Sequence, residues 1–399
     1  MKRVTKWGAI LLMLLLWGCI SEKDTIDSLT KVDITSSEQG IVPLPDDISS
    51  KMRDVFSKYT KVTAPNGRPI HIFAQSGVSN AKVVRARQIL AMYLTDVKGS
   101  KYGSFKSLIA NSMADRNAAL YFFNTEDDKE QHMSSLTFAP FNGQDLYASE
   151  AFVEGSPEYI QNSPRDASYE EILHLTQDYG ITPMLPQYQK EIYDRAHDAV
   201  SSNIYMPPSE LPKADYDQEY LASVWDVYLD AWAYQDPPAQ YGEYLYNTRE
   251  MLKEKDPIGY GLVEAFLPAV LTYNAHIYEL FEGTFHLDYR EDFSYTHKSK
   301  HLRDATLTGT LNSGLQGNQY DNNLTGNIAD NTFIGGKGDD YIDGNDGTDT
   351  VVYEGMYSEY EITITGTKTV IKDKVSDRDH TDTVIHIEKL QFKDRTISI

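Results

Sequence analysis

A nine-residue glycine period near the carboxyl end constrains the fold more than any other feature of this sequence. Four consecutive segments begin with glycine, at residues 317, 326, 335 and 344, and read GNQYDNNLT, GNIADNTFI, GGKGDDYID and GNDGTDTVV. The eighth residue of each segment is apolar: Leu324, Phe333, Ile342 and Val351. Repeats of a glycine-rich turn and a very short strand are typical of a parallel β-roll. Two segments make one coil, so turns eighteen residues apart are expected to stack.

The glycines and acids of these segments predict calcium ligation. The third segment matches the pattern GGxGxDxUx in full. Glycine adopts turn dihedrals that other residues resist, and Ca²⁺ prefers hard oxygen ligands. The pattern resembles the haemolysin-type calcium-binding repeats of RTX proteins. The candidate calcium residues are Gly335, Gly336, Gly338, Asp340, Gly344, Asp346, Gly347, Asp349, Asn322 and Asn331.

The sixth position of the segments separates two kinds of turn. It is aspartate in the later segments (Asp340, Asp349) and asparagine in the earlier ones (Asn322, Asn331). Asparagine offers a carbonyl oxygen with less charge, so we expect at most two weak sites. Residues 317–352 contain seven aspartates and only one lysine, so without a cation the aspartates repel one another. Calcium binding and folding of the roll are therefore expected to be coupled.

The stretch YEEILHLTQDYG, residues 169–180, is similar to the zinc helix HExxH, with glutamate in place of the first histidine. Glu170 and His174 stand four residues apart, so they share one face of a helix. Glu171 lies beside that face, where HExxH peptidases keep their general base. Zinc accepts carboxylate oxygen as well as imidazole nitrogen. The stretch thus indicates a metal site with one ligand exchanged.

Residues 217–225 (DQEYLASVW) resemble the E-[FY]-x-A-E-x-F helix of lethal-factor-type zinc peptidases, with serine replacing the second glutamate. The resemblance implies that Glu219 completes a zinc site with Glu170 and His174. It also implies that Glu171 acts as general base and Tyr216 faces the oxyanion, with a protein or peptide as substrate. Because two anionic ligands already neutralise Zn²⁺, a bound water should be less acidic than in a site with two histidines.

Other interpretations of this stretch stay open. Ser168 and Glu171 fit a capping box, S-x-x-E, and acids in a first helical turn suit the helix dipole. His174 would then be a hydrogen-bonded core histidine. The central domain is accordingly either a zinc endopeptidase or a non-catalytic scaffold, in which case the protein binds calcium and a surface partner.

The amino terminus predicts export. Residues 1–18 combine a basic start with a short apolar run that ends in LWGC, which resembles the bacterial lipoprotein box. The resemblance implies cleavage before Cys19 and lipid attachment to its sulfur, and thus a membrane anchor. A plain secretory signal is the alternative. Both place the protein outside the cytoplasm, at the outer membrane or cell surface or released. Cys19 is the only cysteine, so no intrachain disulfide forms.

The expected architecture is multidomain. A flexible tether (19–58) precedes an α+β, zincin-like (metallopeptidase-like) domain (59–300), the calcium roll (306–352) and a capping segment (353–399) of antiparallel closing strands. A linker shorter than ten residues separates the central domain from the roll. A formal charge of −22 argues against nucleic acid as a partner. In the central domain we expect strands at 69–74, 118–124 and 146–154, and helices at 80–95, 169–180, 187–202, 219–232 and 262–281.

Overall fold

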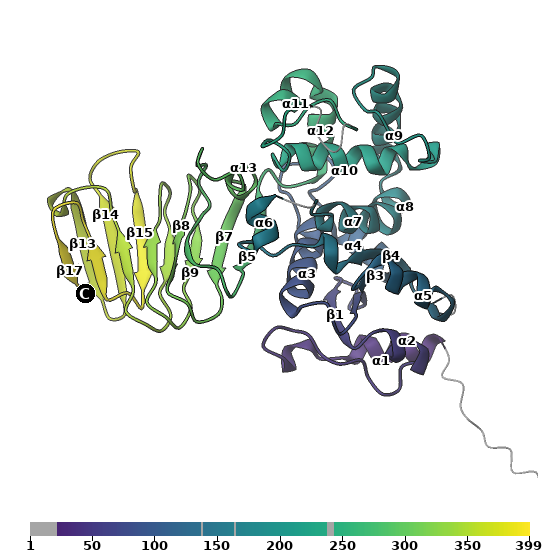
Figure 1. The fold of residues 1–399 in the computed structure, drawn as a ribbon, viewed down its shortest axis with the longest axis horizontal. Coiled ribbons are helices and arrows are strands. Elements are labelled where there is room, and N and C mark those ends of the chain that lie inside the picture. Colours follow the sequence, from purple (N-terminus) through teal and green to yellow (C-terminus); the bar gives the residue numbers. More distant parts are fainter. Residues whose placement is uncertain (1–21, 137–138, 163–164, 238–242) are drawn as a thin grey trace, which may run out of the picture.

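The computed structural model describes residues 22–136, 139–162, 165–237 and 243–399, and shows a chain of mixed helices and strands with several sheets rich in parallel pairs. Figure 1 shows a helix-rich central part, with two short helices on one side and a β-roll that extends away from it to the carboxyl terminus. Within these residues no helix has the length and apolar character needed to cross a membrane. The signal segment and Cys19 lie outside the described residues.

A four-stranded sheet forms the centre of the first part. Its order is β1-β2-β3-β4, with β1 antiparallel to β2 and the other pairs parallel. Alternate residues of a strand point to opposite faces. Ile70 and Ile72 of β2 accordingly join one hydrophobic core, and Phe73 joins the other. The strands are β1 (Lys58–Thr63), β2 (Pro69–Ala74), β3 (Ala118–Phe123) and β4 (Asn142–Tyr147).

Helices cover both faces of this sheet, and further helices pack beyond them (Figure 1). The helical elements are α3 (Asn80–Leu94), α4 (Ser107–Asp115), α5 (Glu126–Leu136), η2 (Ala148–Glu150), α6 (Pro157–Gln161), α7 (Ser168–Thr176), η3 (Gln177–Ile181), α8 (Thr182–Met184), α9 (Pro186–Ser201), η4 (Lys213–Asp215), α10 (Tyr216–Tyr228), α11 (Arg249–Lys255), α12 (Pro257–Phe266) and α13 (Thr296–Ser299). The strands β1–β4 alternate along the chain with the helices α3–α5. The sequence had predicted strands first and helices after them. A zincin-like architecture stays a hypothesis.

The amino-terminal segment differs from the predicted tether. It forms α1 (Glu22–Lys31), η1 (Ile34–Ser36) and α2 (Ser50–Val55). Leu29, Ile48, Met52 and Phe56 are buried against the sheet face that carries Phe73. The Lys61 ammonium also donates to the carbonyls of α1 residues at 3.1 and 2.9 Å. The segment is mostly polar, so its sequence did not indicate that these few apolar side chains pack against the sheet.

Two sheets form the roll, and the chain alternates between them. Their orders are β13-β14-β15-β11-β9-β7-β5 and β17-β16-β12-β10-β8-β6. The strands are β5 (Leu271–Ile277), β6 (Gly283–His286), β7 (Leu302–Leu307), β8 (Ser313–Gln316), β9 (Asn323–Thr325), β10 (Thr332–Ile334), β11 (Tyr341–Asp343), β12 (Thr350–Val352), β13 (Tyr360–Thr365), β14 (Lys368–Asp373), β15 (Thr381–Ile385), β16 (Lys389–Gln391) and β17 (Thr396–Ser398), with η6 at Tyr357–Glu359.

The repeat stacks as its spacing predicts. Leu324 pairs with Ile342 and Phe333 with Val351, in parallel register eighteen residues apart. All four side chains are buried, so they fill the interior between the two sheets.

The roll is longer than the repeat at both ends. It begins at β5, where a helix was expected through residue 281; α12 ends at Phe266, and residues 271–277 alternate as a strand because β7 pairs with them. No short linker therefore precedes the repeats. At the other end β15 and β16 stack in parallel on β11 and β12, and β14 and β17 then pair with them in antiparallel fashion, as β13 does with β14. The segment 353–399 thus contributes one more coil.

Candidate metal sites

The turns of the roll stack as two ladders, one on each edge. Residues 317–322 stack on 335–340, and residues 326–331 stack on 344–349. The backbone of Gly336 and Gly338 is left-handed, with φ of 93° and 110°. A Cβ at these two positions would lie 2.5 Å and 2.6 Å from carbonyl oxygens of the preceding turn. Only glycine therefore fits, because the stacked backbones leave no room for a side chain.

The asparagine turns are closed by their own side chains. Asn322 donates from Nδ2 to the Arg303 carbonyl at 2.8 Å and to Asn318 Oδ1 at 3.0 Å, and its Oδ1 accepts from the Asn318 N–H. Asn331 repeats this pattern with Ser313 and Asn327. These amide groups donate to carbonyl oxygens, the role that a cation would otherwise fill. Asn322 and Asn331 were predicted as calcium ligands, and in the structure they hydrogen-bond within the roll instead.

The aspartate turns are left open. Asp340 Oδ1 accepts from the Asn322 N–H at 2.8 Å, and Asp349 Oδ1 accepts from the Asn331 N–H at 2.7 Å. The Oδ2 atom of each aspartate is buried and has no hydrogen-bond partner. Burial raises the pKa of Asp340 to about 7 and that of Asp349 to about 6. Buried carboxylate oxygens without a partner are costly, so each of these atoms needs a proton or a cation.

The same ladders continue into residues that the repeat does not contain. The Asp340 N–H donates to Asp382 Oδ1 at 3.2 Å, and the Asp349 N–H donates to Glu388 Oε2 at 2.7 Å. Burial, together with the charge of Asp340, raises the pKa of Asp382 well above its usual range. Sequence reasoning missed Asp382 and Glu388. The signal was present, since both precede the x-apolar-x triplet of β15 or β16, but their distance from the previous turn breaks the nine-residue period.

Oxygen atoms converge at both open turns. A Cβ on Gly344 would lie 2.0 Å from the His386 carbonyl oxygen and 2.5 Å from Asp349 Oδ2. A Cβ on Gly335 would lie 2.3 Å from Asp340 Oδ2 and 3.4 Å from Asp382 Oδ2. A Cβ on Gly317 or Gly326 of the asparagine turns would lie equally close, at 2.1 Å and 2.4 Å from the Gly335 and Gly344 carbonyl oxygens, so this spacing keeps glycine at the start of every turn. What sets the aspartate turns apart is the unpartnered carboxylate oxygen, which is the kind of ligand atom that Ca²⁺ prefers.

The remaining predicted calcium residues have smaller parts. Gly347 has a φ of 128°, so it serves the turn geometry. Asp346 is exposed, and the structure does not place it with the unpartnered oxygens.

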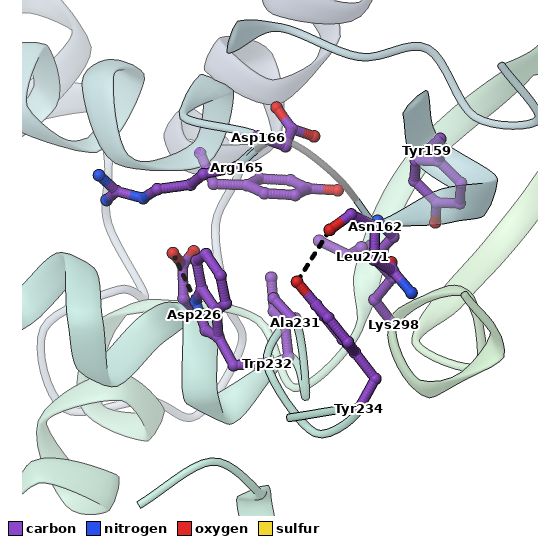
Figure 2. A pocket seen from close by; sticks show the side chains of 12 residues that line it. Tyr159, Asn162, Arg165, Asp166, Asp226, Ala231, Trp232, Tyr234, Leu271 and Lys298 are labelled. Atoms are coloured by element: carbon purple, nitrogen blue, oxygen red, sulfur yellow. Dashed lines mark hydrogen bonds between the residues drawn. The ribbon is translucent and has the colours of Figure 1, made fainter. Parts of the chain in front are cut away.

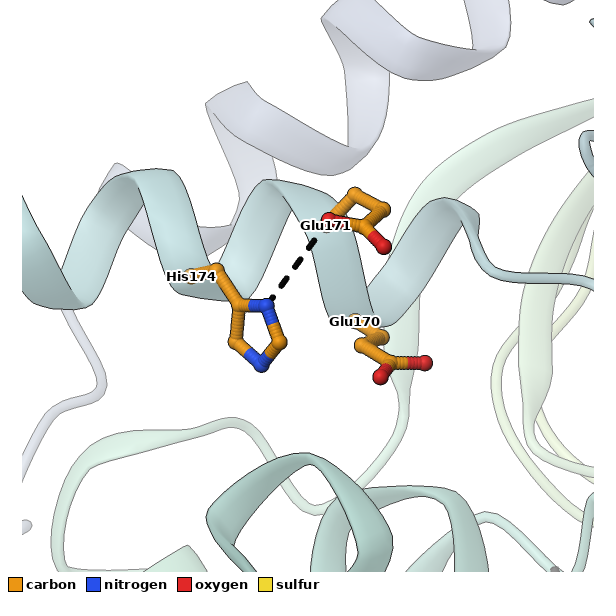
Figure 3. Close-up of side chains that lie close together, drawn as sticks. All are labelled: Glu170, Glu171 and His174. Atoms are coloured by element: carbon orange, nitrogen blue, oxygen red, sulfur yellow. Dashed lines mark ion pairs between the residues drawn. The ribbon is translucent and has the colours of Figure 1, made fainter. Parts of the chain in front are cut away.

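The second candidate site lies on α7. Ligand atoms of Glu170, Glu171 and His174 lie within 4.8 Å of one another, so this group could hold a metal ion. Figure 3 shows Glu170 and His174 extending to the same side of the helix. His174 Nδ1 is 3.7 Å from Glu171 Oε2, and the buried His174 Nε2 has no hydrogen-bond partner. Burial acts to lower the pKa of His174, but Glu171, Glu219 and Asp178 together raise it.

Local structure presents these side chains without a capping box. The residue before α7 is Ala167, and Ser168 is the first residue of the helix and makes no side-chain cap. Glu171 instead accepts a hydrogen bond from the Gln144 amide of β4. The capping interpretation of Glu171 is therefore wrong.

The third predicted zinc ligand is not part of this group. Among the described residues, the atoms that gather within 4.8 Å belong to Glu170, Glu171 and His174, without Glu219. Glu219 is close enough for its charge to act on His174. Tyr216 begins α10, and its ring centroid lies 5.9 Å from that of His197. Its role toward an oxyanion stays a prediction.

Arg165, just before α7, pairs directly with the Glu170 carboxylate. Figure 2 shows this arginine at the edge of a small cavity, with Asp226 and Trp232 on the same side. The cavity measures about 30 Å³, which is room for about one water molecule rather than a peptide. Because a guanidinium engages one predicted ligand and Glu219 stands apart, the predicted zinc trio does not fit zinc as it stands.

Comparison with known proteins adds little. No family model matches the chain, and no curated protein matches its sequence. Among solved structures, the crystal structure of extracellular lipase LipA from Serratia marcescens aligns with a TM-score of 0.23 and 16% identity. The alignment covers 27% of this chain and 16% of the lipase chain, so this chain spans only a small part of that protein. A similarity this distant supports no conclusion about fold or function.

Proposed function

We propose that this chain is an extracytoplasmic calcium-binding lipoprotein whose RTX-like roll takes up Ca²⁺ at its two aspartate turns. One site uses Asp340 with Asp382, and the other uses Asp349 with Glu388 and the His386 carbonyl. Weak affinity suits calcium outside the cytoplasm, where modules with dissociation constants of about 10⁻⁴–10⁻³ M are used. The lipid anchor at Cys19 belongs to the same proposal and rests on the LWGC stretch.

One contrast supports this proposal most. Turns of the same ladder are closed where position six is asparagine and carry a buried, unpartnered Oδ2 where it is aspartate. A divalent cation satisfies these oxygens and offsets the repulsion between neighbouring acids.

Calorimetric titration of the purified chain with CaCl₂, after removal of metal with chelator, tests the proposal. We expect binding in the range of about 10⁻⁴–10⁻³ M and a rise in the melting temperature of the roll. Asp340→Asn and Asp349→Asn should each remove one site. Asp377→Asn removes the same charge from a side chain that is 90% exposed, so it should bind like wild type. Absence of any heat or melting shift at several millimolar calcium contradicts the proposal.

For the central domain we propose the non-catalytic alternative. Pairing of Glu170 with Arg165 favours it, because a peptidase would need that side chain on its metal. A casein digestion assay with wild type and Glu171→Gln tests this choice. Cleavage that depends on Glu171 would establish a peptidase instead.

A further inference from the structure

We propose that the Arg165 guanidinium is the internal cation of the α7 site, and that removing it turns this site into one that binds zinc. This goes beyond calcium binding by the roll, and it concerns a different part of the molecule. The arrangement is one in which a side chain of the protein neutralises a cluster of acids that would otherwise attract a metal ion.

Glu170 is the first reason for this assignment. Its side chain is 4% exposed, and a buried carboxylate needs an opposite charge. Arg165 supplies that charge from the loop just before α7. The guanidinium places a positive charge beside the acid, while Glu170 Oε2 itself has no hydrogen-bond partner.

The surroundings of Arg165 are acidic on several sides. Burial raises the pKa of Glu150, Asp226 and Glu243, and the charge of Arg165 acts against that rise in all three. These acids come from η2, from α10 and from the segment after it. Arg165 therefore compensates a cluster of carboxylates, of which Glu170 is the closest partner.

His174 provides the independent sign of a metal ligand. It is buried, its Nε2 has no hydrogen-bond partner, and its ring lies in the same compact group as Glu170 and Glu171. Imidazole nitrogen and carboxylate oxygen are both ordinary zinc ligands. The group thus holds a free nitrogen ligand beside a carboxylate that the arginine occupies. Since like charges repel, guanidinium and Zn²⁺ compete for one place.

Zinc binding by equilibrium dialysis, with metal analysis, tests this inference on four versions of the chain. Wild type and Arg165→Lys, which keeps the cation, should both bind zinc weakly. Arg165→Gln should bind one zinc ion per chain with affinity higher by about tenfold or more. Adding His174→Ala to Arg165→Gln should abolish this gain, which separates the α7 site from zinc held elsewhere. Equal zinc affinity of wild type and folded Arg165→Gln would overturn the inference.

A second pair of variants covers the case in which Arg165→Gln fails to fold because Glu170 is left unpaired. Glu170→His removes the buried acid and restores the HExxH pattern. Combined with Arg165→Gln it should bind zinc at least about tenfold more tightly than Glu170→His alone. No difference between these two proteins would refute a role for Arg165. None of these outcomes bears on calcium binding by the roll, which is read separately by calcium titration.

Discussion

At the last position of each roll turn, the side chains differ by one functional group, an amide in Asn322 and Asn331 and a carboxylate in Asp340 and Asp349. The amide donates as well as accepts, so it bonds both a backbone carbonyl of β7 or β8 and the side-chain oxygen of another asparagine in its own turn. The carboxylate only accepts, and one of its oxygens therefore stays without a partner. If the roll binds calcium as proposed, its dependence on the cation should therefore differ from one turn of the ladder to the next.

Lys106 is another buried residue whose charged group has no hydrogen-bond partner. It is fully buried, its Nζ has no hydrogen-bond partner, and it lies 4.3 Å from the centre of the Phe266 ring. Burial lowers the pKa of Lys106 to about 7. Between this pH and the usual value of 10.5 the unfolded chain binds a proton that the folded chain has lost. Stability should therefore rise with pH across this window.

Lys106→Met tests this reasoning. The substitution removes an unpaired buried amine, so we expect the free energy of unfolding near pH 7 to increase by roughly 1–3 kcal/mol. The variant should also lose part of the rise in stability between pH 7 and 9. Urea unfolding followed by the fluorescence of Trp225 and Trp232 measures both effects. Lys98→Met, at an exposed position of the same domain, should change neither. A destabilised Lys106→Met protein would contradict the account.

At the scale of single elements, helices and strands could be predicted from the sequence where the pattern that sets them lies within one segment. The α3, α7, α9 and α10 helices and the β2 and β3 strands appear close to their expected residues, because apolar period and turn chemistry act within one segment. The strand at 271–277 was expected as helix, since its pairing partner β7 lies some thirty residues later. Asp382 and Glu388 were not predicted as site residues for the same reason. They come next to the repeat turns through the parallel pairing of β15 and β16 with earlier strands.

The Asn322→Asp substitution tests whether a turn closed by an asparagine side chain becomes one with an unpartnered carboxylate oxygen. The variant loses the donations to the Arg303 carbonyl and to Asn318, and it adds a charge beside Asp340. We expect the roll without calcium to lose roughly 1–3 kcal/mol, and calcium to restore more stability than it adds to wild type. Thermal melting with chelator and with millimolar CaCl₂ measures the difference. Asn312→Asp, at an exposed position before β8, is the matched control. Equal melting of variant and wild type in chelator would count against self-closure of the asparagine turns.

At the scale of the whole molecule, the roll is continuous with the central domain. Strand β5 carries Tyr273, whose hydroxyl donates to Glu154 at 2.6 Å and lies 2.7 Å from that of Tyr169 in α7. Glu154 also accepts from Arg85 of α3 at 2.8 Å. Buried networks of this kind fix one arrangement when every member has a partner. The first coils of the roll are therefore held by packing and hydrogen bonds that need no cation.

This arrangement predicts a gradient of calcium dependence along the roll, which Figure 1 lets the reader follow from β5 to β17. Coils next to the central domain are closed by Asn318, Asn322, Asn327 and Asn331, whereas the far coils contain the unpartnered oxygens of Asp340 and Asp349. Removal of calcium should therefore free the far end while the near end stays ordered, because local opening follows local stability.

Hydrogen exchange of the intact chain, read by mass spectrometry, measures this gradient directly. With chelator, amides of β11, β12, β15 and β16 should exchange at least about tenfold faster than with calcium, which corresponds to a loss of about 1.4 kcal/mol of local stability. Amides of β5–β8 should exchange equally in both conditions. Uniform loss of protection from β5 to β17 would mean that the roll folds as one unit. Equal protection of the far coils with calcium and with chelator would instead mean that Asp340 and Asp349 are protonated and need no cation.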